Sequence, residues 1–507
     1  MLRNVCIFAH TKICNKLLID RLMSTIKDLA PQELWRNFYS LTQIPRPSGH
    51  TKQVSDFLVA FGKDLGLESF VDNAGNVVIR KPATPGMENR KGVILQAHMD
   101  MVPQKVADVE HDFTKDPIET WVDGEWLRAK GTTLGADDGL GVAAIMAVLE
   151  SKTIKHGPIE ALITRDEETG MYGAFNLKAD TLKGDILLNL DSETEGELYI
   201  GCAGGLDIIA TLQYKETEPA KDFTAKKIVL KGLRGGHSGM EICEGRANGV
   251  KVLTRVVHDV LVEFDSQLAA FHGGNMRNAI PREGEAVLMV NPDDVAELTT
   301  YINEYEEQLN KEYAPIESGI SLKLEDAEKP AGIVPVEVQD NLIDALMACH
   351  DGVVRYIPTV PDTVETSSNL AIVNIAGGNA EFQILARSSN DAMKDYLADC
   401  LESCFNMAGM KTEFKGGYSG WQPNVESPIL KAMVTSYEQQ FGEKPRVKVI
   451  HAGLECGIIG AVYPNMDMIS FGPTLQSPHT PNERANIPSS QKFFDFLVAT
   501  LAQTPEK

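Results

Sequence analysis

Short uninterrupted apolar runs alternate with amphipathic stretches along the first part of the chain. Apolar runs of strand length predict buried strands at 76–80, 93–97, 159–164 and 185–190. A helical pattern covers 138–150, between two of these strands, and also 31–65, where it breaks at 44–49. Alternation of strands and helices predicts an α/β sheet with helices on both faces.

The pattern changes character near the glycine-rich segment 201–205. The residues that follow predict a separate α+β unit, with strands at 227–233, 285–290 and 381–386 and helices at 246–270, 294–311 and 391–408. After about residue 415 the α/β pattern returns, with a helix at 427–441 and a strand at 466–471. We therefore predict a three-layer α/β domain with a mixed, mostly parallel sheet, formed by residues 23–204 and 400–507. An α+β domain of residues 205–399 is inserted into it.

The first residues do not fit either domain. Residues 1–22 mix apolar side chains with basic ones and contain no small-residue cleavage site of the secretory kind. The first well-formed amphipathic segment follows Met23. We expect residues 1–22 to be a disordered extension, or to precede the biological start of the protein.

Composition narrows the class of protein. A chain of 507 residues is too long for one ordinary core, and 43% hydrophobic with 23% charged residues is typical of a soluble globular protein. The net charge of −23 argues against nucleic-acid partners and anionic membrane surfaces. The eight cysteines form no C-x-x-C motif, which favours free thiols in a reducing compartment. We expect a cytoplasmic protein.

The segment Gln96–Asp100 places His98 and Asp100 at the end of the predicted strand 93–97. A neutral imidazole is a good zinc ligand, and a nearby carboxylate can fix its orientation. Taken alone, a hydrogen-bonded or surface histidine beside an exposed aspartate is the simpler interpretation. The remainder of the chain decides between these interpretations.

Four further segments place carboxylates or histidines where predicted elements begin or end. They are Gly135–Gly139, Arg165–Gly170, Asp191–Glu193 and Ser477–Glu483. Each has an ordinary explanation by itself: a helix cap, a solvated acidic turn, a single acidic residue after a strand, and a loop histidine. Together they place several like charges on one rim of one sheet, where they would repel one another. Divalent metals remove that repulsion, so the sequence predicts a metal site. Paired zinc ions about 3.5–4 Å apart activate water for attack, and manganese or cobalt also suit these ligands.

The five segments resemble, in order, the motifs of the co-catalytic zinc peptidases that include carboxypeptidase G, aminoacylase, tripeptidase and carnosinase. The resemblance covers residues 24–507 and is strongest to the branch that contains the aminoacyl-histidine dipeptidases. It implies two metal ions. The metal ligands that it implies are His98, Asp137, Glu168, Asp191 and His479.

The resemblance also implies roles for neighbouring residues. Asp137 would bridge the two metals and be joined to Asp138 by a cis peptide bond. Asp100 would hold the His98 ring, and Glu167 would act as the general base. In the inserted domain, the residues implied to contact substrate are His237, Asn278, Arg387 and Gly453. His237 resembles a histidine that stabilises the oxyanion, often across a dimer interface, and Arg387 would bind the substrate carboxylate.

Three functions are consistent with the sequence. The first is a dinuclear zinc dipeptidase, acting as a homodimer, that hydrolyses unblocked dipeptides and notably Xaa-His; the inserted domain would be its lid. The second is a deacylase or carbamoylase of N-acyl amino acids with the same metal centre. Asp191, where other members have Glu, favours the dipeptidase. The third is an inactive metal-binding scaffold, which the complete set of implied ligands disfavours.

Overall fold

The computed structural model describes residues 25–507, so the expectation for residues 1–22 lies outside the described part. The described chain forms two compact units. Unit 1 contains residues up to Ile200, Asn424–Lys448 and Ile458–Lys507, and unit 2 contains Gly201–Pro423 and Val449–Gly457. Unit 2 therefore extends further than the predicted insertion of 205–399. The reason is that β19 (Lys411–Tyr418) pairs with β9 (Gly204–Gln213) in its sheet.

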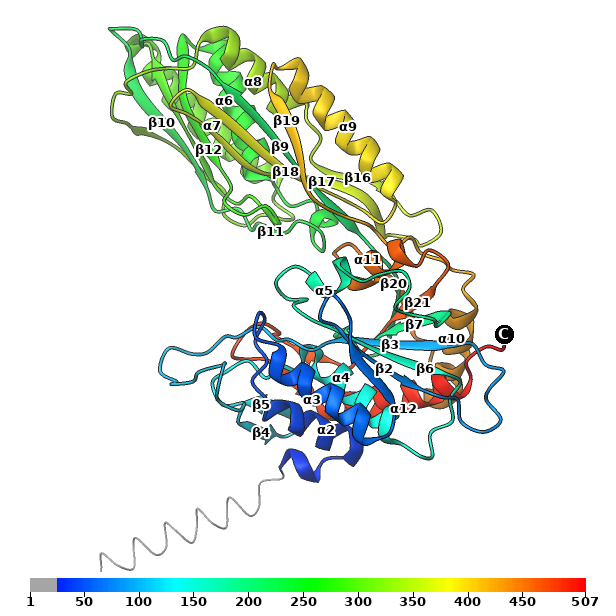
Figure 1. Ribbon diagram of the computed structural model, residues 1–507. Coiled ribbons are helices and arrows are strands. Elements are labelled where there is room, and N and C mark those ends of the chain that lie inside the picture. The colour runs from blue at the N-terminus through cyan, green and yellow to red at the C-terminus, as the bar shows by residue number, and fades with distance from the viewer. Residues whose placement is uncertain (1–24) are drawn as a thin grey trace, which may run out of the picture. The chain divides into compact units, whose positions relative to one another are not determined.

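Unit 1 contains a mixed eight-stranded sheet (Figure 1). In spatial order its strands are β1 (Glu68–Val71), β2 (Val77–Lys81), β6 (Ile159–Thr164), β3 (Val93–His98), β7 (Ile186–Asn189), β21 (Asp467–Ser470), β8 (Glu197–Cys202) and β20 (Arg446–Ile450). The last two residues of β8 and of β20 are counted in unit 2. The strands β6, β3, β7 and β21 are parallel, whereas β1, β2 and β8 pair in antiparallel fashion around them. Every residue of β3, β6 and β7 is buried. Because successive side chains point to opposite faces of a sheet, both faces are covered, as in a three-layer fold.

Helices and a second small sheet complete unit 1. The helices are η1 (Ile26–Asp28), α2 (Gln32–Thr42), α3 (Lys52–Asp64), α4 (Ala136–Glu150), α5 (Tyr172–Phe175), α10 (Pro428–Phe441), α11 (Glu455–Val462), whose first turn belongs to unit 2, and α12 (Ile487–Ala502). Helix α4 packs on β3, α3 on β1 and β2, and α10 on β21. The small sheet has the order β22 (Leu475–Gln476), β23 (Arg484–Asn486), β5 (Trp126–Ala129) and β4 (Thr120–Asp123).

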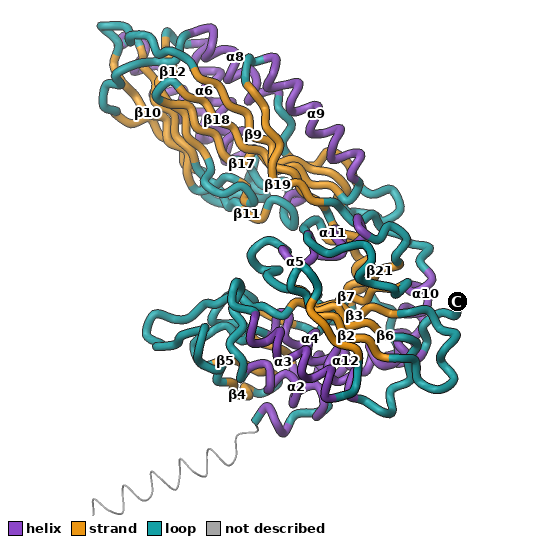
Figure 2. Tube along the Cα trace, viewed as in Figure 1, coloured by secondary structure: helices purple, strands orange, loops and turns teal. Residues whose placement is uncertain are grey.

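Unit 2 is a nine-stranded antiparallel sheet covered by long helices (Figure 2). The strands are β15 (Ser321–Asp326), β10 (Thr224–Lys231), β14 (Gly284–Val290), β12 (Ser266–Gly273), β17 (Val364–Ala376), β18 (Asn379–Ser388), β9 and β19, with β16 (Gly352–Tyr356) paired to β17. The helices are α6 (Gly249–Glu263), α7 (Val295–Glu312), α8 (Val336–Ala348) and α9 (Asp391–Met407), with the short η2 (Ile242–Glu244) and η3 (Pro292–Asp294). Apolar side chains of α6, α7, α8 and α9 share one core with the sheet. The short strands β11 (Gly236–His237) and β13 (Ala279–Ile280) form a separate two-stranded sheet.

One predicted element of unit 2 is wrong in its length. The expected helix 246–270 ends at Glu263, and β12 begins at Ser266. The run of Leu268 to Phe271 suits a helix in isolation, but β12 pairs with both β14 and β17. Tertiary pairing overrides local propensity here. Across the described chain, no helix combines the length and apolar character that a membrane crossing requires.

Candidate functional site

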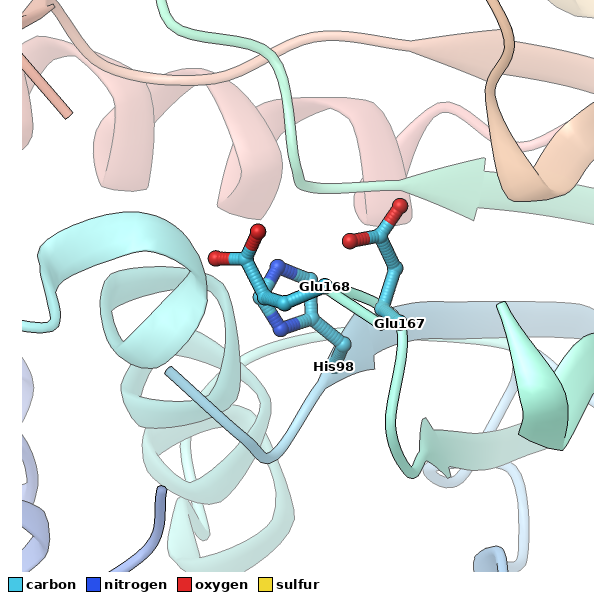
Figure 3. A group of neighbouring side chains, drawn as sticks. All are labelled: His98, Glu167 and Glu168. Carbon is cyan, nitrogen blue, oxygen red and sulfur yellow. The ribbon is translucent and has the colours of Figure 1, made fainter. Parts of the chain in front are cut away.

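The carboxyl ends of three adjacent parallel strands bring most of the predicted metal ligands together. His98 is the last residue of β3, which lies between β6 and β7. Glu167 and Glu168 follow the end of β6, and Asp191 follows the end of β7. Figure 3 shows the Glu168 carboxylate next to the His98 ring and the Glu167 side chain directed alongside it, and the three side chains offer ligand atoms within 4.8 Å of one another.

Two further groups of side chains share Asp137. In the first, His98 Nε2 lies 3.1 Å from Asp137 Oδ1 and 3.4 Å from Asp191 Oδ1. In the second, His479 Nε2 lies 3.0 Å from Asp137 Oδ2 and 3.0 Å from Glu168 Oε2. The two oxygens of Asp137 thus face different histidines. This arrangement gives two adjacent sets of three potential metal ligands that share the Asp137 carboxylate.

Local backbone structure places the two ligands that do not follow a strand of the large sheet. Asp137 lies in the first turn of α4, where its backbone is not helical, and the peptide bond between Asp137 and Asp138 is cis. The cis bond agrees with what the resemblance implied. His479 lies in the loop between β22 and β23 and has a positive φ of 59°.

The chemistry of this donor set fits two divalent cations. Each set combines a histidine with carboxylates and no thiolate, a combination that zinc, manganese and cobalt accept. Burial, reinforced by the charges of Asp137 and Glu168, raises the pKa of Asp191 to about 6. Burial and the charges of Asp137 and Asp191 also raise the pKa of Glu193 to about 8. Carboxylates packed this closely need a positive charge among them, which bound metals would supply.

Asp100 connects the end of β3 with the loop that carries the two glutamates. Its Oδ1 accepts the backbone N–H of Glu167 at 3.1 Å, and its Oδ2 accepts the N–H of Glu168 at 3.3 Å and the hydroxyl of Ser48 at 2.8 Å. The His98 Nδ1 atom lies 3.7 Å from Asp100 Oδ1 and 3.2 Å from the Asp100 carbonyl oxygen. Asp100 thus holds the loop that contains Glu167 and Glu168 and also contacts the His98 ring.

Glu483 binds the backbone of the turn 134–137, which carries Asp137, and the sequence analysis did not predict this contact. Its buried carboxylate accepts four successive backbone N–H groups, from Leu134 at 2.7 Å, Gly135 at 2.9 Å, Ala136 at 2.7 Å and Asp137 at 3.2 Å. Glu483 does fall within the segment Ser477–Glu483 that resembled a family motif. Its position there was the only available signal, because nothing local indicated which backbone it would meet.

Arg46 supports the same turn from another segment. The buried guanidinium donates to the carbonyl oxygens of Met99 and Asp100, each at 3.1 Å, and to that of Gly135. A Cβ atom on Gly135, where φ is +69°, would lie 2.7 Å from Arg46 Nη2. The glycine therefore provides both the left-handed turn and the space for Arg46. Sequence reasoning had treated 44–49 only as a helix break.

In unit 2 the structure defines the tautomer of His237. The Nδ1 atom of His237 accepts the backbone N–H groups of Gly239 at 3.2 Å and Met240 at 3.0 Å. An imidazole nitrogen that accepts carries no proton, so the proton of the neutral ring is on Nε2. Burial and the charge of Arg387 lower the pKa of His237, which favours this neutral form. His237 thus presents a neutral Nε2–H donor.

The other predicted substrate residues lie around Ser238 and Tyr418, also within unit 2. Arg387 is buried and donates to both of these hydroxyls. The carbonyl of Asn278 accepts the Ser238 N–H at 2.9 Å, whereas the Asn278 residue is largely exposed. The backbone of Gly453 lies against the Tyr418 ring. Sequence reasoning did not single out Ser238 or Tyr418.

Comparison with known proteins gives consistent results. Residues 94–503 match the family described as Peptidase family M20/M25/M40. The chain is 44% identical over 485 residues to a cytosol non-specific dipeptidase of Escherichia coli (strain K12), covering 96% of this chain and all of that relative.

Solved structures agree with this match. A crystal structure of an aminoacylhistidine dipeptidase from Vibrio alginolyticus has 46% sequence identity and a TM-score of 0.91, covering 96% of this chain and 99% of that one. A tripeptidase from Staphylococcus aureus shares the fold at 17% identity, with a TM-score of 0.53 and coverage of 94% and 98%. The chain belongs to Peptidase family M20/M25/M40.

Proposed function

We propose that this protein is a dinuclear metallodipeptidase that hydrolyses unblocked dipeptides, notably Xaa-His. The observation that carries the proposal is the pair of three-ligand sets that share Asp137, with Glu167 beside them. The names of the relatives, a cytosol non-specific dipeptidase and an aminoacylhistidine dipeptidase, support the substrate class. We propose zinc as the metal, with cobalt or manganese as substitutes, and a cytoplasmic location by analogy with the first relative.

His98, Asp137 and Asp191 would hold one metal ion, and Asp137, Glu168 and His479 the other. Two divalent ions bound there would polarise the scissile carbonyl and lower the pKa of the attacking water. Glu167 would accept the proton of that water and return it to the leaving amine. Asp100 would keep Glu167 in place through the N–H bond at 3.1 Å.

Unit 2 would bind the dipeptide. The neutral Nε2–H of His237 would donate to the developing oxyanion, which needs a hydrogen-bond donor and no proton transfer. Arg387 would bind the substrate carboxylate. Among the residues that the structure describes, this buried guanidinium has no carboxylate partner within salt-bridge distance. A buried charge without a counter-charge is costly, and a substrate carboxylate would neutralise it.

The proposed reaction uses residues of both units, so we propose that unit 2 acts as a lid over short peptides. We also propose that the protein is a homodimer in which His237 of one subunit acts in the site of the other. Light scattering of the purified protein tests the homodimer, and a monomer with full activity would exclude it.

Hydrolysis of alanyl-histidine and of its N-acetyl analogue tests the proposed activity. We expect turnover of the free dipeptide, its loss after chelation, and its recovery on adding two equivalents of zinc per chain. Preference for the N-acetyl compound would instead show a deacylase. Activity that resists complete metal removal, verified by elemental analysis, would contradict the metal centre.

A further inference from the structure

The surroundings of Arg387 contain two hydroxyl groups to which the proposed function gives no role. Arg387 Nε and Nη2 both donate to Ser238 Oγ, each at 3.3 Å, and Nη1 donates to the Tyr418 hydroxyl oxygen, also at 3.3 Å. Charge-assisted hydrogen bonds are usually about 2.7–2.9 Å long. These longer contacts orient the guanidinium without satisfying its charge.

The number of hydrogens shows what remains available. A guanidinium has five N–H donors, and the contacts with Ser238 and Tyr418 use one on each nitrogen. One N–H therefore remains on each terminal nitrogen, so two donors are left for the oxygens of a carboxylate. Both hydroxyl oxygens act as acceptors toward Arg387, so their own O–H hydrogens are not used in these contacts.

The backbone around Tyr418 fixes the position of its ring. A Cβ atom on Gly205 would lie 2.6–2.8 Å from the ring and hydroxyl of Tyr418, and one on Gly453 would lie 3.1–3.4 Å from them. Both glycines thus allow the ring to fit closely between two backbone segments. Lys394 Nζ donates to the Tyr418 carbonyl oxygen at 2.6 Å. These contacts fix the Tyr418 hydroxyl next to Arg387.

Ser238 is fixed in a similar way. Only 1% of its surface is exposed, and its N–H donates to the Asn278 carbonyl at 2.9 Å. Ser238 directly follows His237, so the predicted oxyanion donor and the Arg387 contact are adjacent in sequence. Any displacement of Ser238 would therefore also move His237 and change the contact with Arg387.

We propose that Arg387, Tyr418 and Ser238 form one carboxylate-binding site, in which both hydroxyls orient the guanidinium and donate their O–H hydrogens to the C-terminal carboxylate of the dipeptide. This inference rests on the proposed dipeptidase function and deepens it. It makes Tyr418 and Ser238 specificity-determining residues that select a free carboxylate over a blocked one.

The substitutions Tyr418→Phe and Ser238→Ala test the site, each removing one oxygen. Matched controls are Tyr214→Phe and Ser389→Ala, because these buried hydroxyls of unit 2 have no hydrogen-bond partner among the described residues. The kinetic substrates are alanyl-histidine and its C-terminal amide. Because a hydrogen bond to a charged group is lost, we expect KM for the free acid to rise about 10- to 100-fold in each test variant, with kcat nearly unchanged. The amide should be affected much less, and the controls should match the wild type.

A binding measurement separates this inference from the proposed activity. Calorimetry in the full-length, metal-loaded Glu167→Ala background gives Kd for both ligands without relying on turnover. A selective loss of affinity for the free acid, in either Tyr418→Phe or Ser238→Ala, supports the site even if the wild type hydrolyses neither compound. Equal weakening of acid and amide, unchanged discrimination in both variants, or no binding of the free acid to the background protein would overturn it. Failure of hydrolysis by the wild type would overturn only the proposed function.

Discussion

Replacing Glu483 by Gln should destabilise unit 1 and also disturb Asp137, the proposed bridging ligand. The two oxygens of Glu483 each accept two backbone N–H groups of the turn 134–137. In the glutamine variant one oxygen becomes an NH₂ group, which cannot accept. Two N–H donors then lose their partner and face another donor in a buried position.

The size of the effect follows from those two lost bonds. A hydrogen bond to a charged group contributes about 1.5–3 kcal/mol, so the free energy of unfolding should fall by about 3–6 kcal/mol. Asp137 is one of the four donors, so its position should also change and metal affinity should fall. Chemical denaturation of the metal-loaded protein measures the first effect, and elemental analysis after dialysis measures the second.

Glu160→Gln is the matched control. Glu160 is also buried in unit 1, and it accepts the backbone N–H groups of Lys183 at 2.7 Å and Gly184 at 2.8 Å. It lies near the opposite end of β6 from the metal ligands, so this variant should lose stability but keep its metal. The reasoning is refuted if Glu483→Gln has wild-type stability, or if it retains metal as fully as the Glu160 variant does.

Two further predictions follow from the same contacts. Asp100→Asn removes an acceptor for the backbone of the loop that carries Glu167, so kcat should fall about 10- to 100-fold with a smaller change in KM. An unchanged kcat in steady-state kinetics would contradict this role of Asp100. Asp351 has its pKa raised to about 6 by burial, so the protonated form favours the fold and its stabilising contribution is lost as pH rises from 4 through 6. Asp351→Asn keeps the Oδ1 acceptor for Leu370 and Asn248. Relative to the wild type, this variant should have a free energy of unfolding higher by up to about 3 kcal/mol at pH 7.5 but not at pH 4. Equal denaturation midpoints of the variant and the wild type at both pH values would contradict this prediction.

Local sequence was sufficient to predict which of the proposed metal ligands lie together at strand ends. His98 and Asp191 follow buried apolar runs, and the carboxyl ends of neighbouring parallel strands necessarily meet at one edge of the sheet. The alternation of strands and helices likewise predicted the α/β and α+β parts of the fold. The proposed difference in role between Glu167 and Glu168 rests only on the resemblance, because spacing cannot distinguish adjacent carboxylates.

Contacts between distant segments could not be predicted in this way. Glu483 meets a turn nearly 350 positions earlier, and the distance is bridged by the pairing of β23 with β5. Tyr418 reaches Arg387 because β19 and β18 both pair with β9. The same pairing explains why unit 2 extends beyond the predicted boundary at residue 399. No local pattern in the sequence encodes such strand neighbours.

The most direct test of the proposed reaction is the metal content and turnover of Glu167→Ala, measured on the same sample. Glu167 is proposed to move protons, whereas the proposed metal ligands are His98, Asp137, Glu168, Asp191 and His479. We predict two metal ions per chain, a wild-type melting temperature and no detectable hydrolysis of alanyl-histidine. Turnover near the wild-type rate in this fully metal-loaded variant would contradict the account.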